Sequence, residues 1–241
     1  MKFAIAKEHR DFFQKNGLIE FEDFLSEEQV STVNRAIDRV LTERLKVTPQ
    51  RLKLLSSECV FSQGRDLWRS NEELKKIVCQ PKFAEIASEL IEKKPLRLGY
   101  DQLFPAHYQT KFSSKQQRIY AQFLEQTLSL ESISGVSGVL CGLMICLGEK
   151  GELFSQEQFS IEGIDIYSRQ AGHAIYFNPN ALVNWRNFYA HSAYRYFLIV
   201  YTQNHSHYQL QVSDPHTHFL KQLGYVFNDK LNDRLHPIVY R

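Results

Sequence analysis

The chain has 241 residues, of which 43% are apolar and 23% are charged, with a formal net charge of +2. This length suits one large domain or two small ones, and the composition is ordinary for a globular protein. The weak, scattered charge lacks the concentrated basic face of a DNA-binding domain, so we expect no nucleic-acid partner. Seventeen Phe and twelve Tyr residues favour a large β component.

The cysteines and the N-terminus indicate a cytoplasmic protein. The four cysteines show no CxxC spacing, and two of them, Cys141 and Cys146, fall in an apolar run where a buried, reduced thiol is expected. The first residues, MKFAIAKEHRDFF, hold too short an apolar stretch for a signal peptide. No stretch approaches the ~18 apolar residues of a membrane span, so we expect no membrane partner.

Residues 1–95 are predicted to be mainly helical. Apolar positions recur at helical spacing over residues 5–16, which end at Gly17, and a short strand is predicted directly after this glycine. The clearest helix covers residues 27–44, because Ser26 is a good N-cap and acidic residues fill the first turn. Two more helices are predicted over residues 71–78 and 81–93, and the mixed stretch 47–64 is interpreted as loop with short strands.

Residues 96–212 are predicted to form a β-rich core, followed by a helix and tail over residues 213–241. The patterns favour a single α+β domain covering residues 1–241. Residues 114–130 fit a helix or a long loop equally well. Strands are predicted over residues 96–104, 138–147, 159–167, 174–177 and 194–201, and a C-terminal helix over residues 217–223.

Three stretches carry a resemblance to a known family. Residues 12–30 (FFQKNGLIEFEDFLSEEQV) have the order helix, Gly-led strand and helix beginning Leu-Ser-x-Glu, and residues 100–104 read YDQLF. Residues 171–179 (AGHAIYFNP) are followed by YRYFLIVY at residues 194–201. Together they resemble the phytanoyl-CoA dioxygenase-like branch of the non-haem Fe(II)/2-oxoglutarate-dependent oxygenases. The resemblance implies a double-stranded β-helix (jelly-roll, cupin-like) core with N-terminal helices packed on it.

In this family, two histidines and one carboxylate hold Fe(II) and leave positions open for 2-oxoglutarate and oxygen. The best match to the first histidine and the carboxylate is His107 followed by Gln109, where a neutral amide replaces the acid. A looser alignment places this motif near residues 115–118, with no ligand. The position of the second histidine falls on Asn184, and His191 is the nearest alternative. The resemblance therefore implies an incomplete metal triad.

Arg195 matches the family arginine that binds the distal carboxylate of 2-oxoglutarate. A guanidinium can hold a carboxylate through paired, charge-assisted hydrogen bonds. The resemblance places Tyr100 and Asn184 in the same ligand pocket. The open alternative is a rim arginine paired with a local acid.

Two His-x-His pairs, His205 with His207 and His216 with His218, form a separate candidate metal site. Residues i and i+2 of a strand point to one face, so either pair could hold zinc, nickel or copper. The alternative is a polar, histidine-rich loop after the last strand.

Three functions follow. The first is a non-standard or inactive member of the oxygenase fold, which binds a small carboxylate ligand or has a regulatory role. The second is an active Fe(II)/2-oxoglutarate dioxygenase with unusual ligands, including His107 and His191. The third is a regulator that depends on a divalent metal bound by the histidine pairs.

Overall fold

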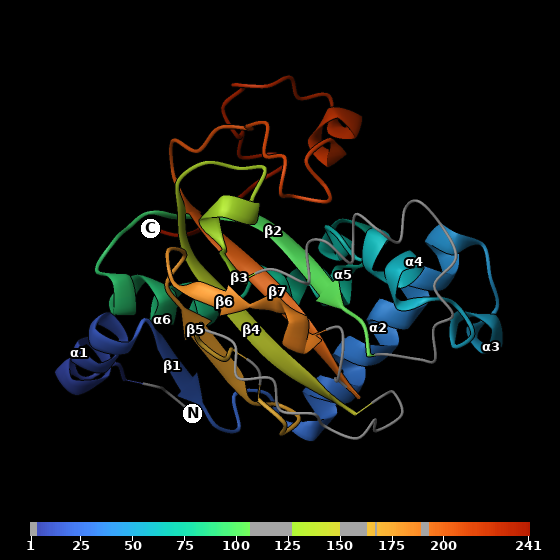
Figure 1. The fold of residues 1–241 in the computed structure, drawn as a ribbon, viewed down its shortest axis with the longest axis horizontal. Coiled ribbons are helices and arrows are strands. Elements are labelled where there is room, and N and C mark those ends of the chain that lie inside the picture. Colours follow the sequence, from blue (N-terminus) through green and yellow to red (C-terminus); the bar gives the residue numbers. More distant parts are fainter. Residues whose placement is uncertain (1–3, 107–126, 150–162, 167, 189–192) are drawn as a thin grey trace.

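The structure, a computed structural model, describes residues 4–106, 127–149, 163–166, 168–188 and 193–241. A curled antiparallel sheet forms its centre, with strands in the order β1-β5-β4-β7-β2-β8, and β3 and β6 form a separate two-stranded sheet (Figure 1). The strands are β1 (Leu18–Phe21), β2 (Leu96–Phe104), β3 (Thr127–Ser129), β4 (Val139–Glu149), β5 (Ala174–Phe177), β6 (Leu182–Asn184), β7 (Tyr194–Gln203) and β8 (Ile238–Tyr240).

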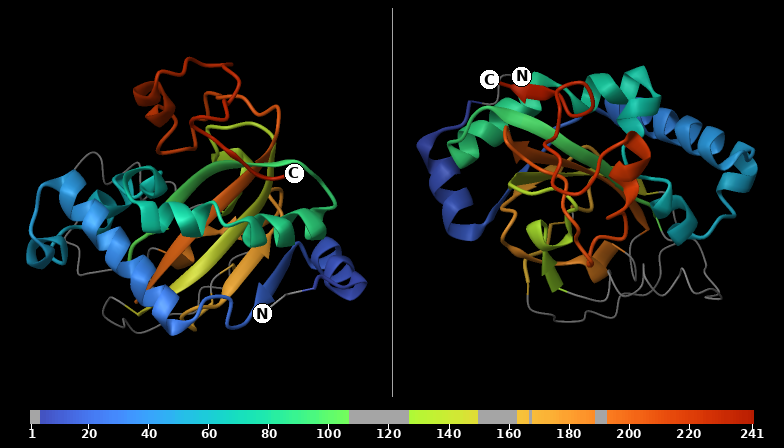
Figure 2. Two further views of the ribbon diagram at one scale, coloured as in Figure 1. Left: turned by 180° about the vertical axis from the view of Figure 1, so that it is seen from behind. Right: turned by 90° about the horizontal axis from the view of Figure 1, so that it is seen from above.

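The N-terminal helices cover one face of the large sheet, as Figure 2 shows from behind and from above. The α-helices are α1 (Lys7–Asn16), α2 (Glu27–Leu45), α3 (Pro49–Leu52), α4 (Ser57–Ser62), α5 (Glu72–Val78) and α6 (Pro81–Ile91). The short 3-10 helices are η1 (Leu67–Ser70), η2 (Glu131–Ile133), η3 (Trp185–Phe188) and η4 (Phe219–Leu223). No helix in the described part of the chain is long and apolar enough to cross a membrane.

Local signals explain where the main helices begin and end. Helix α1 ends at Gly17, whose positive φ of 73° suits the left-handed region that glycine adopts at low cost. Helix α2 begins after Ser26, which accepts a hydrogen bond from the backbone N–H of Gln29 at 3.3 Å, while the Gln29 side chain accepts one from the Ser26 N–H at 3.0 Å. This reciprocal capping box confirms the predicted start of the helix.

The stretch 47–64 corrects the sequence prediction, because it contains α3 and α4 rather than short strands. Thr48 and Ser56 each accept a hydrogen bond from a backbone N–H in the first turn of the helix that follows. Pro49 occupies a first-turn position of α3. These N-cap signals favour helices even though the apolar residues of this stretch do not recur at helical spacing.

The predicted strands in residues 96–104 and 174–177 are confirmed at their bounds, and β4 and β7 each extend two residues beyond the prediction. Strands β6 and β8 have three residues each, too few for an alternating pattern to be visible in the sequence. The predicted strand 159–167 lies largely outside the described residues. The predicted C-terminal helix is the shorter 3-10 helix η4.

The large sheet separates two hydrophobic cores. In β7, Phe197, Ile199 and Tyr201 face the N-terminal helices. Tyr196 and Leu198, from the same strand, belong to the other core, between the large sheet, the small sheet and the C-terminal segment. This alternation follows from the period of two in a strand, and it decides which residues can share a site. We call the second core the inner core.

The C-terminal segment, residues 204–235, closes the end of the inner core near the end of β7 (Figure 1). Tyr208 forms a bridge with Val136, and His207 forms one with Lys230. The chain then returns to the edge of the large sheet, where β8 pairs with β2.

Candidate functional site

Aromatic side chains fill the middle of the inner core. The rings of Phe104 and Trp185 are stacked with centroids 5.6 Å apart, and Phe188 contacts Tyr196 edge-on at 5.0 Å. The Trp185 indole donates a hydrogen bond to the Leu128 carbonyl at 2.8 Å, so its only polar atom is satisfied. These aromatic residues are all buried. The wall of the inner core is therefore apolar and closely packed here.

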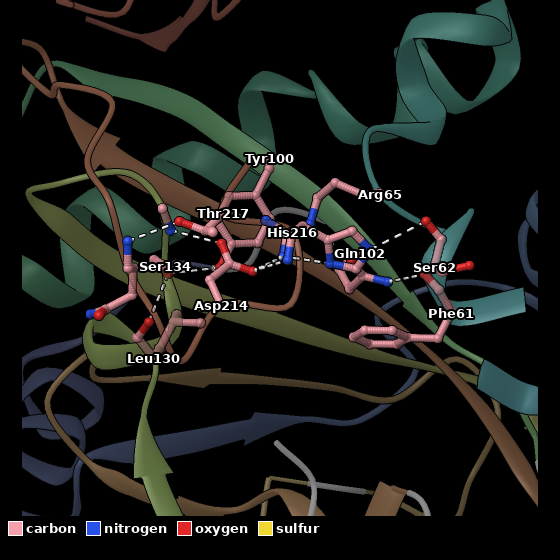
Figure 3. A network of polar contacts seen from close by, with 12 residues as sticks. Phe61, Ser62, Arg65, Tyr100, Gln102, Leu130, Ser134, Asp214, His216 and Thr217 are labelled. Atoms are coloured by element: carbon pink, nitrogen blue, oxygen red, sulfur yellow. Dashed lines mark hydrogen bonds and ion pairs between the residues drawn. The ribbon is translucent and has the colours of Figure 1, made fainter. Parts of the chain in front are cut away.

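One end of the inner core holds a buried arginine, Arg65, which is only 7% exposed (Figure 3). Its guanidinium lies over the Tyr100 ring, 3.8 Å from the centroid, and its Nε donates to Gln102 Oε1 at 2.9 Å. Its Nη2 donates to Asp214 Oδ1 at 3.2 Å, which forms an ion pair. Stacking and directed hydrogen bonds together fix the plane of the guanidinium.

The loop that carries Arg65 is held against β2. The Leu103 N–H donates to the Gly64 carbonyl at 2.9 Å, and Arg65 forms a bridge with Gln102. A Cβ at Gly64 would lie 2.9 Å from the Leu103 Cβ, so this close approach requires glycine. From α2, the Arg44 guanidinium donates to the backbone carbonyls of residues 63, 65 and 66 at 2.7–2.9 Å. Arg65 is thus positioned by the sheet and by α2.

Asp214 comes from the C-terminal segment and is bound by donors from three parts of the chain. Its Oδ1 accepts from Arg65 and from the His216 N–H at 2.8 Å, and its Oδ2 accepts from the Gly135 N–H at 2.8 Å. The side chain of Asp214 is 1% exposed. The ionised carboxylate therefore has both a charged partner and neutral donors, as a buried anion requires.

His216 completes this network as a neutral imidazole. Its Nδ1 lies 3.4 Å from Arg65 Nη2, and its Nε2 lies 3.3 Å from the Ser62 carbonyl oxygen. Burial and the neighbouring Arg65 guanidinium hold the pKa of His216 well below its usual value. The contacts fit the tautomer in which Nε2–H donates to Ser62 and Nδ1 accepts from Arg65.

Tyr100 and Gln102 are engaged in the same network. The Tyr100 hydroxyl lies 2.7 Å from Ser134 Oγ, which itself donates to the Leu130 carbonyl at 2.7 Å, so the tyrosine donates. Burial raises the pKa of Tyr100 to about 12, which keeps it a neutral phenol. Gln102 Nε2 donates to the carbonyls of residues 61 and 103 at 3.1 and 2.9 Å.

A small cavity of about 20 Å³ lies beside this network. Its wall includes Arg65, Tyr100, Val136, Asp214 and Leu220. This volume holds about one water molecule, so the closed network leaves no room for an organic ligand.

The structure places Arg195 on the opposite face of the sheet from Arg65. Its Nη1 donates to Asp38 Oδ1 at 2.8 Å and to Asn34 Oδ1 at 3.1 Å, both on α2. This is the pairing with a local acid that the sequence left open. Of the other predicted pocket residues, Tyr100 lies under Arg65 in the inner core, and Asn184 is buried on β6 opposite Thr127. The structure does not bring Tyr100 and Arg195 together.

The remaining predicted metal ligands divide into two groups. His107, Gln109 and His191 lie outside the described residues, so the predicted triad stays a prediction. The four histidines of the two His-x-His pairs are all described, and they make separate contacts. His216 joins the Arg65 network, His207 pairs with Lys230 through the backbone, and His205 and His218 are exposed. Among the described residues, no group of three or more His, Cys, Asp or Glu side chains could hold a metal ion.

Sequence reasoning missed Arg65 and Asp214 as partners. The Asp-Pro-His run at residues 214–216 is a turn signal, in which a carboxylate commonly accepts from the backbone N–H two residues later. That local contact is present, since Asp214 accepts from the His216 N–H. No local pattern links this turn to Arg65, which is 149 residues away.

The fold is like that of solved non-heme, alpha ketoglutarate dependent enzymes. The structure is similar to that of SnoK, the non-heme alpha ketoglutarate dependent carbocyclase from nogalamycin biosynthesis, with a TM-score of 0.60 and 15% identity over 97% of this chain and 96% of SnoK. It is also similar to the epimerase SnoN, with a TM-score of 0.60 and 12% identity over 97% of this chain and 98% of SnoN. The non-heme monooxygenase ThoJ gives a TM-score of 0.50 and 11% identity over 82% of this chain and 78% of ThoJ.

At these identities the likeness shows the fold alone. No protein-family model and no curated protein matches the sequence.

The described residues of the inner core supply no set of three ligands for an iron such as the one in the SnoN complex. In this core, the one described carboxylate beside a histidine, Asp214, is already paired with Arg65, whose positive charge repels a divalent cation. Near Phe104 and Trp185, the described wall is lined by aromatic rings, which do not bind iron.

Proposed function

We propose that this protein keeps the double-stranded β-helix core of the phytanoyl-CoA dioxygenase-like branch without its iron- and 2-oxoglutarate-dependent reaction. It acts instead as a binding or regulatory protein. One observation carries the proposal: the described inner core is filled by packed aromatic rings and closed at one end by the Arg65 network. The standard reaction requires space and open coordination positions beside the metal for 2-oxoglutarate and oxygen.

The placement of Arg195 supports the same proposal. In β7, residues facing the inner core alternate with residues facing α2, and Arg195 belongs to the second set. Its guanidinium is engaged by Asp38 and Asn34 rather than directed at the inner core. The arginine inside the fold, Arg65, already holds a carboxylate of the chain itself.

Calorimetric titration tests the proposal directly. The full chain is titrated with Mn(II) and with 2-oxoglutarate, each alone and in the presence of the other, and succinate release is measured with Fe(II). We expect no mutually dependent binding and no succinate above the protein-free control. SnoK treated in the same way serves as the positive control. Tight 2-oxoglutarate binding that requires the metal would overturn the proposal.

An active oxygenase is the second candidate, because the likeness to SnoK extends over 97% of the chain. In that case His107 and His191 are the ligands to test. Succinate release should then depend on Fe(II) and be lost in His107→Ala and His191→Ala. The matched control is His205→Ala, at an exposed histidine after β7, which should retain full activity.

A further inference from the structure

We propose that Arg65, which Tyr100 and Gln102 hold in place, forms a binding site for a small carboxylate together with the Gly135 N–H, and that the chain fills this site with its own Asp214. The inference goes beyond the proposed function. It concerns the closed end of the inner core and stands whether or not the barrel is catalytic.

The Asp214 carboxylate is bound in the way that a separate ligand would be. Its Oδ1 accepts hydrogen bonds from the Arg65 guanidinium and the His216 N–H, and its Oδ2 accepts one from the Gly135 N–H. Both carboxylate oxygens therefore have hydrogen-bond donors. Asp214 belongs to no helix or strand, and its own backbone is held by turn contacts with Gln211 and Thr217. The carboxylate thus attaches this turn to the inner core, beside the contact of His216 with Ser62 and the hydrogen bond from the Tyr208 hydroxyl to the Thr217 carbonyl.

The site is built independently of the aspartate. Arg65 is held from below by the Tyr100 ring at 3.8 Å and from the side by Gln102 at 2.9 Å. Its loop is anchored by Arg44. A guanidinium that is oriented in advance binds an anion without a further ordering cost. Without Asp214 this buried cation would lack a charged partner, which favours uptake of an anion from solution.

Size restricts the ligand to one or two carbons. The side chain that Asp214→Gly removes corresponds to an acetate ion, and the adjoining cavity adds only about 20 Å³. A longer dicarboxylate would contact Phe219 and Leu220, which border the cavity. In the natural chain the tethered carboxylate has a high effective concentration at Arg65, so free acetate competes poorly.

The test measures thermal unfolding of the full chain with Asp214→Gly, in sodium acetate or formate and in sodium chloride of equal ionic strength. We expect the variant to melt lower than the natural protein in chloride. Acetate should raise its midpoint in proportion to the logarithm of the acetate concentration above Kd, by about 5 °C at roughly 30 times Kd. The natural protein should show no acetate-specific shift.

Two controls make the result specific. Asp233→Gly removes the partner of Arg97, whose Nη2 lies 2.7 Å from Asp233 Oδ1. The Asp233 side chain is 66% exposed, so water fills the space that this substitution leaves and no enclosed anion site forms. This variant should not respond to acetate. The double variant Arg65→Met with Asp214→Gly should lose the acetate response, because the guanidinium is gone.

Three results would overturn the inference: equal effects of acetate and chloride on folded Asp214→Gly, an acetate response that persists without Arg65, or an equal response in the natural protein. If Asp214→Gly does not fold in chloride, refolding yields in acetate and chloride provide the readout. A higher yield in acetate that requires Arg65 supports the site, and equal yields overturn it. Melting needs no metal and no turnover, so failure here leaves the succinate test of the proposed function unaffected.

Discussion

Arg65 and Arg195 are both buried arginines paired with one aspartate, yet they lie on opposite faces of the same sheet. Asp214, the partner of Arg65, has a side chain that is 1% exposed, whereas Asp38, the partner of Arg195, is 40% exposed. Asp38 also borders an open groove of about 420 Å³ along α2. Water can therefore replace Asp38 but not Asp214. Similar contact distances thus have different energetic consequences.

The largest expected effect comes from breaking the inner pair. Arg65→Met leaves the Asp214 carboxylate buried without a charged partner, so we expect unfolding to become easier by about 3–5 kcal/mol. Urea denaturation measures this change. A control that replaces both partners, Arg65→Met with Asp214→Leu, should recover much of the loss, since no unpaired charge remains. A loss below 1 kcal/mol in the single variant would show that this pair is solvated like the outer one.

Acid pH should destabilise the fold through two buried histidines, His236 and His216, whereas the Arg195 side of the sheet should contribute less. Burial lowers the pKa of His236, which contacts Arg69, the Gly99 carbonyl and the Tyr225 ring, from 6.5 to about 4. The unfolded chain takes up this proton near pH 6.5 and the folded chain only near pH 4. Stability is therefore lost as the pH falls through this window, by about 3 kcal/mol from His236.

Urea denaturation of His236→Gln and the natural protein at pH 7 and pH 4 measures this contribution. The informative quantity is the difference in unfolding free energy between the two proteins at each pH. Burial raises the pKa of Asp101, which makes both proteins more stable as the pH falls, and this common contribution cancels in the difference. His216 on the inner side has a lowered pKa, so His216→Gln should also reduce acid sensitivity. Parallel pH curves for the natural protein and both variants would contradict the assignment.

An intermediate effect is expected where the outer arginine has a buried partner. Asn34 accepts from Arg195 at 3.1 Å and donates to the Leu147 carbonyl at 2.8 Å. Asn34→Ala leaves both groups short of a partner, so we expect a loss of about 2 kcal/mol in urea denaturation. Ser31→Ala, in the same groove, is the matched control and should lie within about 0.5 kcal/mol of the natural protein.

The smallest effect is expected for the exposed partner itself. Asp38→Ala should cost about 1 kcal/mol or less, and the cost should shrink further in high salt, because solvent screens a half-exposed pair. Denaturation at low and high salt measures both quantities. If Asp38→Ala lowered the free energy of unfolding as much as Arg65→Met does, the exposed pair would contribute as much as the buried one, and the proposed difference between the two pairs would be wrong.

Local sequence signals account for much of the fold. Helix α2 could be predicted from the Ser26 cap and its apolar face, and β2 and β5 from their patterns and flanking residues. These elements depend on neighbours a few positions away, so their causes can be read along the chain. The short β6 and β8 have no such pattern; β8 forms at the edge of the longer β2, and β6 forms by pairing with the equally short β3.

The sequence by itself determined that Arg195 begins an apolar strand and that Asp214 begins a turn. Only the tertiary structure decided which face of the sheet each arginine occupies. A strand alternates its side chains with a period of two, but the phase is set by where the helices pack. The pairing of Arg65 with Asp214 joins residues 149 positions apart. Such a contact depends on how the C-terminal segment folds back over the inner core, for which no local pattern exists.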